Sequence, residues 1–280
     1  MEQALKSLFE KRFGAAPSIA PLPAHGSNRS LFRLSGAGKT VVGAYGPDKQ
    51  ENATFLAFSR HFRKCGLPVP EIYGDDAEAQ VYIEQDLGDT TLFEFLTKNR
   101  GAAGPSDAVI AAYEKVVALL PRFQIEAGKT LDYRACYPRS AFDRQSMAWD
   151  LNYFKYYFLR LAKIPFNEQL LEDDYTRFAD HLLAADREYF LYRDFQSRNV
   201  MMQDGAPWFI DYQGGRKGAL QYDIASLLFD AKADLPFELR EHLLAKYIEA
   251  AGVDRKRFLE HYPGYCYIRI MQAMGAYGLR

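Results

Sequence analysis

Short alternating runs of apolar and polar residues in the first hundred positions predict a small sheet. Ser30–Leu34 and Thr40–Tyr45 are two β-prone runs, and Ser35–Gly38 between them has the composition of a hairpin turn. Two further strands are expected near Glu71–Tyr73 and Gln80–Gln85. This part of the chain should therefore form a sheet of short strands.

Two segments of this region have helical spacing. Phe55, Phe58 and Phe62 recur at intervals of three and four, and Pro47-Asp48 before them predicts the start of a helix. The first segment, Met1–Gly14, has the pattern of a short amphipathic helix and lacks the unbroken apolar core of a signal peptide.

Beyond the turn-rich link Asp86–Asp89 the apolar spacing becomes mainly helical. Tyr189–Asp223 departs from this pattern, with short apolar runs and several glycines. The last segment, Tyr265–Arg280, has helical spacing and then stops, which indicates either a frayed terminal helix or a truncated chain. The other predicted helices cover Ala108–Phe123, Met147–Leu161, Leu170–Leu183 and Leu239–Ala251, the last with Gly252 as its C-terminal cap.

Composition narrows the class of protein. The 280 residues carry 35 basic and 36 acidic side chains, so the net charge of −1 gives no support to a general nucleic-acid binder. No apolar run approaches the roughly 18 residues that span a bilayer. The three cysteines are widely spaced and form no CxxC pair, which argues against a disulfide framework and favours the reducing cytoplasm.

Candidate chemistry lies in the atypical stretch. Asp194 is followed by Asn199 five positions later, and Asp211 comes twelve positions after that. Phosphoryl transfer from a nucleotide needs a carboxylate near the acceptor hydroxyl and hard oxygen ligands for magnesium. Val200–Gln203 and Trp208–Ile210 read as strands around the turn Asp204-Gly205, and such a hairpin would hold Asn199 and Asp211 at one end of a rigid ribbon.

This arrangement resembles the protein-kinase-like superfamily, in the branch of aminoglycoside phosphotransferases and choline kinases. That branch has the pattern H-x-D-x-x-x-x-N, then a short hairpin and an Asp; here the pattern begins at Tyr192 in place of the usual His. Gln221–Leu228 is similar to the D-x-A at the start of the next family helix. The local sequence around Arg193-Asp194 and Ile210-Asp211 is most similar to that of the bacterial cell-wall amino-sugar kinases. Those enzymes phosphorylate N-acetylmuramate or N-acetylglucosamine at the anomeric position.

The resemblance implies an α+β, protein-kinase-like two-lobed fold. A small antiparallel-sheet N-lobe with one helix would comprise residues 1–86, and a larger, mainly helical C-lobe would comprise residues 87–280. The resemblance also assigns Asp194 as the catalytic carboxylate and Asn199 and Asp211 as magnesium ligands. ATP and Mg²⁺ are the implied cofactors, although the sequence leaves ATP or GTP open. Asp223 is expected to act as a helix cap and scaffold.

Several residues of the N-lobe are nucleotide-binding candidates by position. Ser27, Asn28 and Arg29 precede the first hairpin strand, where the family has its phosphate-covering loop. The same residues are also typical of a plain surface loop. Glu51 lies where the family has its ion-pairing Glu, and its alternative is an acid favoured by the helix dipole. Gln85-Asp86-Leu87 would form the hinge that reads the nucleobase through its backbone.

One departure from the family is clear. Where the family often has a lysine at the end of the third strand, this chain reads Val41-Val42-Gly43-Ala44-Tyr45. Arg29, Arg33 or Lys39 could replace that cation, and the sequence does not choose among them.

The acceptor is expected to be a small molecule, because only twelve residues separate Asp211 from Asp223 and leave no room for a peptide groove. Asp150 and Asn152, on an aromatic-rich helix, are candidates to bind its hydroxyl groups, although that helix also fits core packing. Arg216 and its neighbour Lys217 would attract an anionic acceptor, unless they are merely a solvated charge pair.

The sequence therefore favours an ATP- and magnesium-dependent phosphotransferase acting on a small hydroxyl compound. An amino sugar is the acceptor that it favours most. The alternatives are a nucleotide-binding pseudokinase or regulatory module, which the missing lysine suggests, and an aminoglycoside or choline-type kinase. Scattered acids such as Asp173, Asp174 and Glu260 form no cluster suited to a polycationic drug. Nucleotide and acceptor are the expected partners, with neither a nucleic acid nor a membrane.

Overall fold

The computed structural model describes the 280-residue chain except for residues 24–27, 103 and 279–280. Its N-terminal part is an antiparallel five-stranded sheet with the strand order β1-β2-β3-β5-β4. The predicted hairpin is confirmed as β2 and β3, and the two predicted later strands are β4 and β5. The strands are β1 (Ser18–Pro21), β2 (Ser30–Gly36), β3 (Lys39–Tyr45), β4 (Ile72–Asp76) and β5 (Val81–Gln85).

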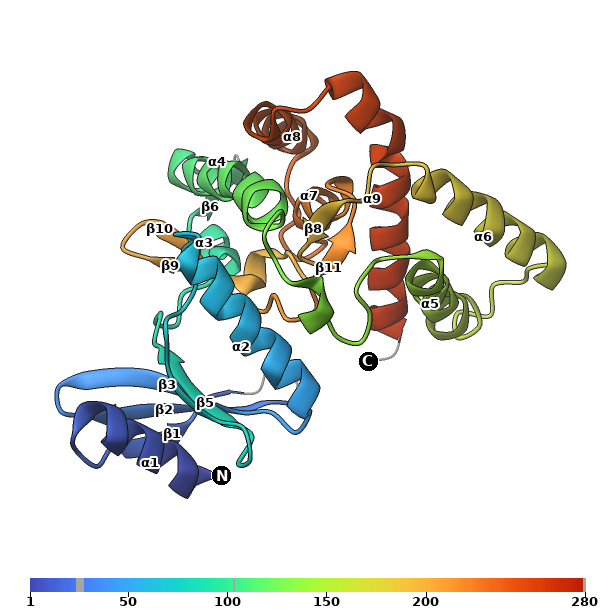
Figure 1. Cartoon of the computed structure of the whole chain (residues 1–280). Coiled ribbons are helices and arrows are strands. Elements are labelled where there is room, and N and C mark those ends of the chain that lie inside the picture. Colours follow the sequence, from blue (N-terminus) through green and yellow to red (C-terminus); the bar gives the residue numbers. More distant parts are fainter. Residues whose placement is uncertain (24–27, 103, 279–280) are drawn as a thin grey trace.

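Helices cover both faces of this sheet (Figure 1). The predicted N-terminal helix is α1 (Glu2–Phe13), and its Leu5 and Phe9 are buried against one face of the sheet with Val41 and Ile83. The other face packs on α2 (Lys49–Lys64). Because neighbouring strand residues alternate between the two faces, the sheet contributes side chains to two apolar clusters, one on each face.

Local chemistry explains why α2 begins where it does. The Asp48 carboxylate accepts hydrogen bonds from the backbone N–H groups of Gln50 (2.9 Å) and Glu51 (3.1 Å), which satisfies two donors that the first helical turn leaves free. The predicted start at Asp48 is confirmed. Phe55, Phe58 and Phe62 then form one buried stripe along the helix.

The rest of the chain is mainly helical, with short two-stranded ribbons between the helices (Figure 1). The ribbons are β6 (Arg100–Gly101) with β7 (Gly104–Pro105), β8 (Tyr189–Leu191) with β11 (Arg216–Gly218), and β9 (Val200–Gln203) with β10 (Ala206–Phe209). The helices are α3 (Leu92–Lys98), α4 (Asp107–Pro121), α5 (Arg144–Phe154), α6 (Glu168–Leu183), α7 (Gln221–Leu228), α8 (Phe237–Ala251) and α9 (Arg255–Gly278).

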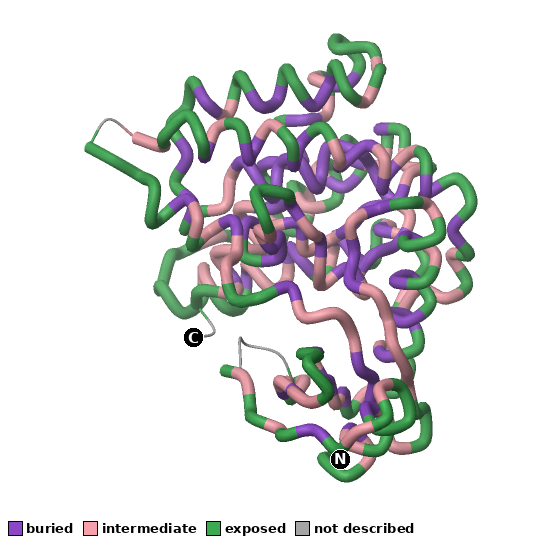
Figure 2. The backbone as a smooth tube through the Cα atoms, turned by 90° about the vertical axis from the view of Figure 1, so that its left-hand side faces the viewer, coloured by how far each residue is buried: buried purple, intermediate pink, exposed green. Residues whose placement is uncertain are grey.

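The main apolar core does not stop at the end of the sheet. Figure 2 shows that buried segments gather in the interior of the helical part, between intermediate and exposed ones. One cluster joins Tyr82 of β5 and Phe62 of α2 to Phe123, Phe190 and Tyr212 of the helical part. The ring of Phe55 stacks on that of Tyr212, with centroids 5.3 Å apart. Helix α2 therefore ties the sheet to the helical part.

Most predicted helices are confirmed, and Gly252 ends α8 in the left-handed conformation with φ of 63°. The periodicity missed α3, which begins at a capping box between Thr91 and Glu94. It also missed the first turns of α9, because Pro263 lies inside that helix. Among the described residues no helix is both long and apolar enough to cross a membrane.

Candidate active site

The three residues singled out by spacing lie together in the structure. Asp194 lies in the loop between β8 and β9, Asn199 ends a short 3₁₀ turn before β9, and Asp211 follows β10. The Asn199 Nδ2 atom donates to the backbone oxygen of Asp194 (2.8 Å) and to Oδ2 of Asp211 (2.9 Å). One amide side chain thus joins the loop to the end of the ribbon.

The β9–β10 ribbon sets this geometry. Val200 pairs with Phe209, and the Ile210 N–H donates to the Asn199 carbonyl (3.2 Å), so the ribbon ends with Asn199 and Asp211 side by side. The predicted hairpin is confirmed. Asp211 has φ of 67°, a left-handed conformation that is uncommon outside glycine. Its second carboxylate oxygen accepts from Gln213 Nε2 (2.7 Å).

Asp194 is partly buried and has charged neighbours. Burial raises its pKa above the ordinary value, and the neighbouring Asp211 carboxylate raises it further. The guanidinium groups of Arg193, Arg269 and Arg198 act in the opposite direction. Asp194 is therefore a better proton acceptor than an exposed aspartate.

Buried hydrogen bonds hold the loop that carries Asp194. Asp223 Oδ2 accepts from the Tyr192 N–H (2.8 Å) and from Gln124 Nε2 (2.8 Å), and Oδ1 accepts from the Arg193 N–H (3.0 Å). Burial raises the pKa of Asp223 to about 7, although these hydrogen bonds lower it. The predicted scaffold role is confirmed, but the predicted cap is wrong: the carboxylate bonds this loop rather than the N-terminus of α7.

Tyr192 stands where the family pattern has a His. Its ring is fully buried, and its hydroxyl donates to the Ile210 carbonyl (2.6 Å), next to Asp211. The side chain therefore supplies a structural hydrogen bond between the loop and the end of the ribbon.

On the sheet side, Arg29 and Glu51 form an ion pair (2.8 Å). The Arg29 guanidinium also lies 5.2 Å from the ring centroid of Phe55, and its side chain is only 11% exposed. Burial lowers its pKa, but the charges of Tyr82, Glu51 and Asp211 outweigh burial and raise it. Arg29 thus lies between α2 and the end of the β9–β10 ribbon. Of its neighbours in the candidate loop, Asn28 is exposed and Ser27 falls outside the described residues.

The other two candidate cations lie elsewhere. Arg33 donates to the carboxylates of Asp86 (2.7 Å) and Asp89 (2.8 Å), and Lys39 is exposed at the β2–β3 turn. Of these three cations, Arg29 is the one paired with Glu51 among the described residues, and its role in place of the family lysine stays a prediction.

The candidate hinge follows β5 directly. The Gln85 N–H donates to the Glu71 carbonyl (2.9 Å), Asp86 is held by Arg33, and the Leu87 side chain is buried. These contacts fix the position of the segment between the sheet and the helical part. Its role as nucleobase-reading hinge stays a prediction.

The three residues proposed to bind the acceptor have different surroundings in the structure. Arg193 donates to both oxygens of Asp150 (2.6 and 2.8 Å), so this carboxylate is engaged in a buried ion pair. Asn152 is partly exposed on α5. Arg216 is buried, and its Nε atom donates to the Gly214 carbonyl (2.9 Å). Their roles toward an acceptor stay predictions.

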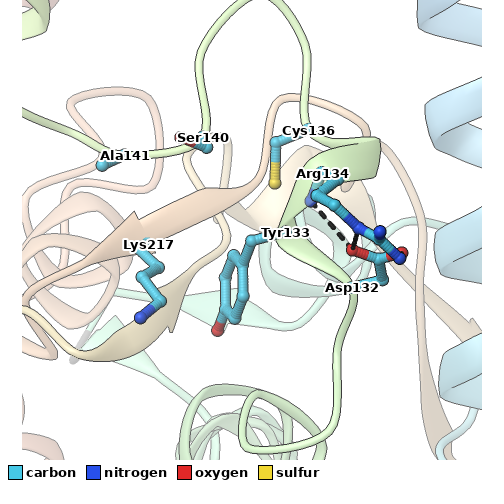
Figure 3. Close-up of a pocket in the computed structure, with 7 residues that line it drawn as sticks. All are labelled: Asp132, Tyr133, Arg134, Cys136, Ser140, Ala141 and Lys217. Carbon is cyan, nitrogen blue, oxygen red and sulfur yellow. Dashed lines mark hydrogen bonds and ion pairs between the residues drawn. The ribbon is translucent and has the colours of Figure 1, made fainter.

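A pocket of about 620 Å³ lies at β11, where Lys217 follows Arg216 in the chain (Figure 3). Lys217 and Tyr133 line it, with the Lys217 ammonium 5.3 Å from the Tyr133 ring centroid and paired to Glu188 (2.6 Å). Because neighbouring strand residues point to opposite faces, Arg216 and Lys217 do not act together. The cavity does not include Asp194 among its lining residues, which are Asp132, Tyr133, Arg134, Cys136, Ser140, Ala141 and Lys217.

Comparison with known proteins identifies a family and related sequences. Residues 18–262 match the sequence profile described as the phosphotransferase enzyme family. An N-acetylmuramate/N-acetylglucosamine kinase from Neisseria meningitidis is 27% identical over 209 residues, which is 73% of this chain and 58% of that protein. A protein of the same name from Pseudomonas putida is 25% identical over 264 residues, or 90% of this chain and 73% of that one.

Solved structures share the fold at low identity. A choline kinase from Cryptosporidium parvum aligns over 99% of this chain and 90% of its own, with a TM-score of 0.68 and 12% identity. An aminoglycoside phosphotransferase bound to streptomycin and ATP aligns over 94% and 86%, with a TM-score of 0.62 and 12% identity. These likenesses establish the two-lobed kinase-like fold that the sequence predicted.

Proposed function

The chain belongs to the phosphotransferase enzyme family, and from this premise we propose that it transfers the γ-phosphate of ATP to a hydroxyl group of an amino sugar. The single observation that carries the proposal is the Asn199 side chain, which joins the Asp194 backbone to the Asp211 carboxylate. That contact presents one carboxylate to an acceptor and two oxygen-bearing side chains to a cation.

Asp194 orients the acceptor hydroxyl and accepts its proton as the new bond to phosphorus forms. Burial and the Asp211 charge raise the pKa of Asp194, which favours proton acceptance. Asp223 and Tyr192 hold the loop in place during the reaction.

Asn199 and Asp211 are the proposed magnesium ligands, and their chemistry fits that metal. Mg²⁺ prefers hard oxygen donors, and the hydrogen bonds of Asn199 to its neighbours use its Nδ2 atom rather than Oδ1. Once bound, the cation would offset negative charge on the phosphates.

Arg29 takes the place of the missing strand lysine in this proposal. Its ion pair with Glu51 and the effect of the Asp211 charge on its pKa support a positive charge near the proposed cation site. This contact weakens the pseudokinase alternative, because the absent lysine was the feature that suggested it. Gln85–Leu87 and Asn28 remain candidates for further contacts to the nucleotide, and residues 1–86 and 87–280 remain the proposed lobes.

Three relatives named N-acetylmuramate/N-acetylglucosamine kinase support an amino sugar as the acceptor. The compartment follows from the same chemistry: the three free thiols and the use of ATP favour the cytoplasm.

The test is ADP release by the purified chain with magnesium and a panel of acceptors: both amino sugars, choline and an aminoglycoside. We expect magnesium-dependent turnover with an amino sugar. Asp194→Asn should lower kcat by about 10²- to 10⁴-fold, because an amide cannot accept the proton, and it should leave nucleotide binding measurable. Turnover confined to choline or the aminoglycoside, or full activity in Asp194→Asn, would overturn the proposal.

A further inference from the structure

The buried hydroxyl of Ser197 is bonded to a carboxylate from a distant part of the chain. Ser197 begins the short 3₁₀ turn Ser197–Asn199, which follows Asp194, and its relative exposure is 0%. Its Oγ atom donates to Oδ2 of Asp230 (2.6 Å), and its backbone N–H donates to the same oxygen (3.3 Å). Because 33 positions separate the two residues, the contact is a tertiary one rather than part of a local turn.

Asp230 lies just beyond the C-terminal end of α7, where the helix itself does not favour an acid. That end of a helix carries a partial negative charge, which repels a carboxylate. One oxygen of Asp230 has a local role, since Oδ1 accepts from the Lys232 N–H (3.2 Å) in a turn. An asparagine would serve this turn equally well. The local turn therefore does not account for the carboxylate, whose other oxygen faces Ser197.

Helix α7 holds the loop that carries Asp194 on both sides of that residue. Asp223, in the first turn of α7, accepts from the two backbone N–H groups that precede Asp194. Asp230, beyond the other end of the helix, accepts from Ser197, which follows Asp194. All eight residues of α7 are buried, so the helix is a firm support for both contacts.

The turn that begins at Ser197 ends at Asn199, one of the two proposed magnesium ligands. The Asn199 N–H donates to the Gln196 carbonyl (2.9 Å), and the Asn199 carbonyl accepts from the Ile210 N–H (3.2 Å). These bonds fix Asn199 relative to the loop and the ribbon, whereas the Ser197 hydroxyl fixes the turn relative to α7. The direction of the Asn199 side chain matters because Mg²⁺ requires nearly ideal octahedral geometry at short distances.

We propose that Asp230 is a positioning residue of the cation site, and that it acts through Ser197 to hold the turn that presents Asn199 to magnesium. The inference rests on the proposed function and adds a residue that supports a metal ligand. Removal of such a supporting residue typically lowers metal affinity by about 10- to 100-fold. Asp223 supports the opposite side of the loop, so its loss should affect the metal less than the loss of Asp230.

The test is the affinity for Mn²⁺ in the presence of ADP, measured by calorimetric titration, which needs no turnover. Mn²⁺ accepts the same oxygen donors as Mg²⁺ and serves as the probe. We expect the Kd for Mn²⁺ to rise by about tenfold in Asp230→Ala. Ser197→Ala should raise it severalfold, because it removes the hydroxyl contact and leaves the backbone N–H and the turn at Lys232 intact.

The double variant shows whether the two side chains act through each other. If they do, its Kd for Mn²⁺ should match that of Asp230→Ala, because the second substitution removes a contact that is already lost. In kinetic assays the magnesium concentration that gives half of the maximal rate should rise, while KM for the acceptor stays unchanged. Hydrogen–deuterium exchange over residues 195–200, measured without metal, should become faster in Asp230→Ala.

Asp186→Ala is the matched control. Oδ1 of Asp186 accepts from the N–H two positions later, that of Glu188 (3.2 Å), and Oδ2 accepts from the Tyr189 hydroxyl (3.0 Å). Asp186 thus makes the same two kinds of contact as Asp230, at an exposed position. Its loss should leave the Kd for Mn²⁺ unchanged.

Three results would overturn the inference: natural Mn²⁺ affinity in the folded Asp230→Ala and Ser197→Ala variants, losses that add in the double variant, or an equal loss in Asp186→Ala. If no acceptor is phosphorylated but Mn²⁺ binding weakens as expected, the proposed function fails and the inference stands. If an amino sugar is phosphorylated and both variants bind Mn²⁺ normally, the inference alone fails. A natural chain that binds no Mn²⁺ with ADP would overturn both.

Discussion

At the scale of single residues, Arg29 is the side chain that we propose as a replacement for another. A lysine at the end of the third strand is missing, and a cation from the residue before β2 makes the contact to Glu51 instead. Arg29 is separated from Glu51 by 22 positions in the chain, and only the packing of α2 on the sheet brings the two together. Spacing in the sequence offered three candidates and no means of choosing among them.

Replacing Arg29 tests this substitution. Arg29→Gln removes the positive charge near the phosphates, so KM for ATP should rise by about tenfold while KM for the acceptor changes little. Steady-state kinetics with each substrate varied in turn provides the measurement. Lys39→Gln, an exposed cation of the same sheet, serves as control and should behave like the natural chain. A rise in both KM values would point to general damage rather than to a phosphate contact.

Glu84 of β5 offers a second residue-scale prediction, based on pH. Its Oε2 atom is buried without a hydrogen-bond partner among the described residues, and burial raises its pKa from 4.5 to about 8, with Arg29 acting in the opposite direction. Between these two values the unfolded chain binds fewer protons than the folded one. The contribution of Glu84 to stability is therefore fully present below pH 4.5 and is lost as the pH rises toward 8.

Glu84→Gln removes this titration and keeps the side-chain volume. The variant should gain stability relative to the natural chain as the pH rises, with the largest difference at pH 8 and above. Urea denaturation at pH 5 and pH 8 provides the measurement. The same difference in unfolding free energy at both pH values would show that Glu84 is already ionised in the folded chain.

At the scale of elements, the sequence predicted those strands, turns and helix ends that are determined by residues close to one another in the chain. The β9–β10 ribbon, the start of α2 at Asp48 and the left-handed Gly252 all follow from local patterns, and the structure confirms them. The spacing of Asp194, Asn199 and Asp211 belongs to the same class, because one loop and one ribbon contain all three.

Contacts between distant elements could not be predicted in this way. Arg193 and Asp150 are 43 positions apart, and their ion pair depends on how α5 packs beside the loop after β8. The sequence offered Asp150 as a candidate acceptor ligand on a helix that also fitted core packing, whereas both of its oxygens accept from Arg193 in the structure. Arg269 was missed for a related reason, since nothing in the pattern around it indicates that α9 reaches Tyr222.

The contact between α7 and the loop after β8 makes a prediction at this scale. In Asp223→Asn an amide donor replaces one carboxylate oxygen and faces backbone N–H groups that need an acceptor. We expect a loss of about 1–3 kcal/mol in unfolding free energy and a lower kcat, because the loop that carries Asp194 loses its support. KM for ATP should change little. Denaturation and kinetics on the same preparation provide the measurement.

Asp254→Asn is the matched control for Asp223→Asn. Asp254 bonds the backbone N–H of Arg257 (2.8 Å) at the start of α9 and is exposed. Its loss should lower stability without lowering kcat. If both variants lose kcat in proportion to stability, Asp223 has no specific role in positioning the loop.

At the scale of the whole molecule, a shared core determines how the sheet and the helical part behave together. Tyr82 of the sheet and Phe62 of α2 lie in one apolar cluster with Phe123 and Tyr212 of the helical part. Arg33 adds a polar link by bonding Asp86 and Asp89, just beyond the sheet. Unfolding one part would expose the apolar surface of the other, so the two should unfold together.

The shared core predicts one thermal transition, and a ligand bound between the two parts should shift all of it. ADP with magnesium at about 100 times its Kd adds roughly 2.7 kcal/mol, which corresponds to a rise in Tm of about 5 °C in a chain of this size. Differential scanning calorimetry with and without the nucleotide provides the measurement. In Asp211→Asn the part of the shift that depends on magnesium should disappear. Two separate transitions, with the nucleotide shifting only one of them, would mean that the sheet and the helical part are stabilised independently and that the aromatic contacts of α2 do not couple them.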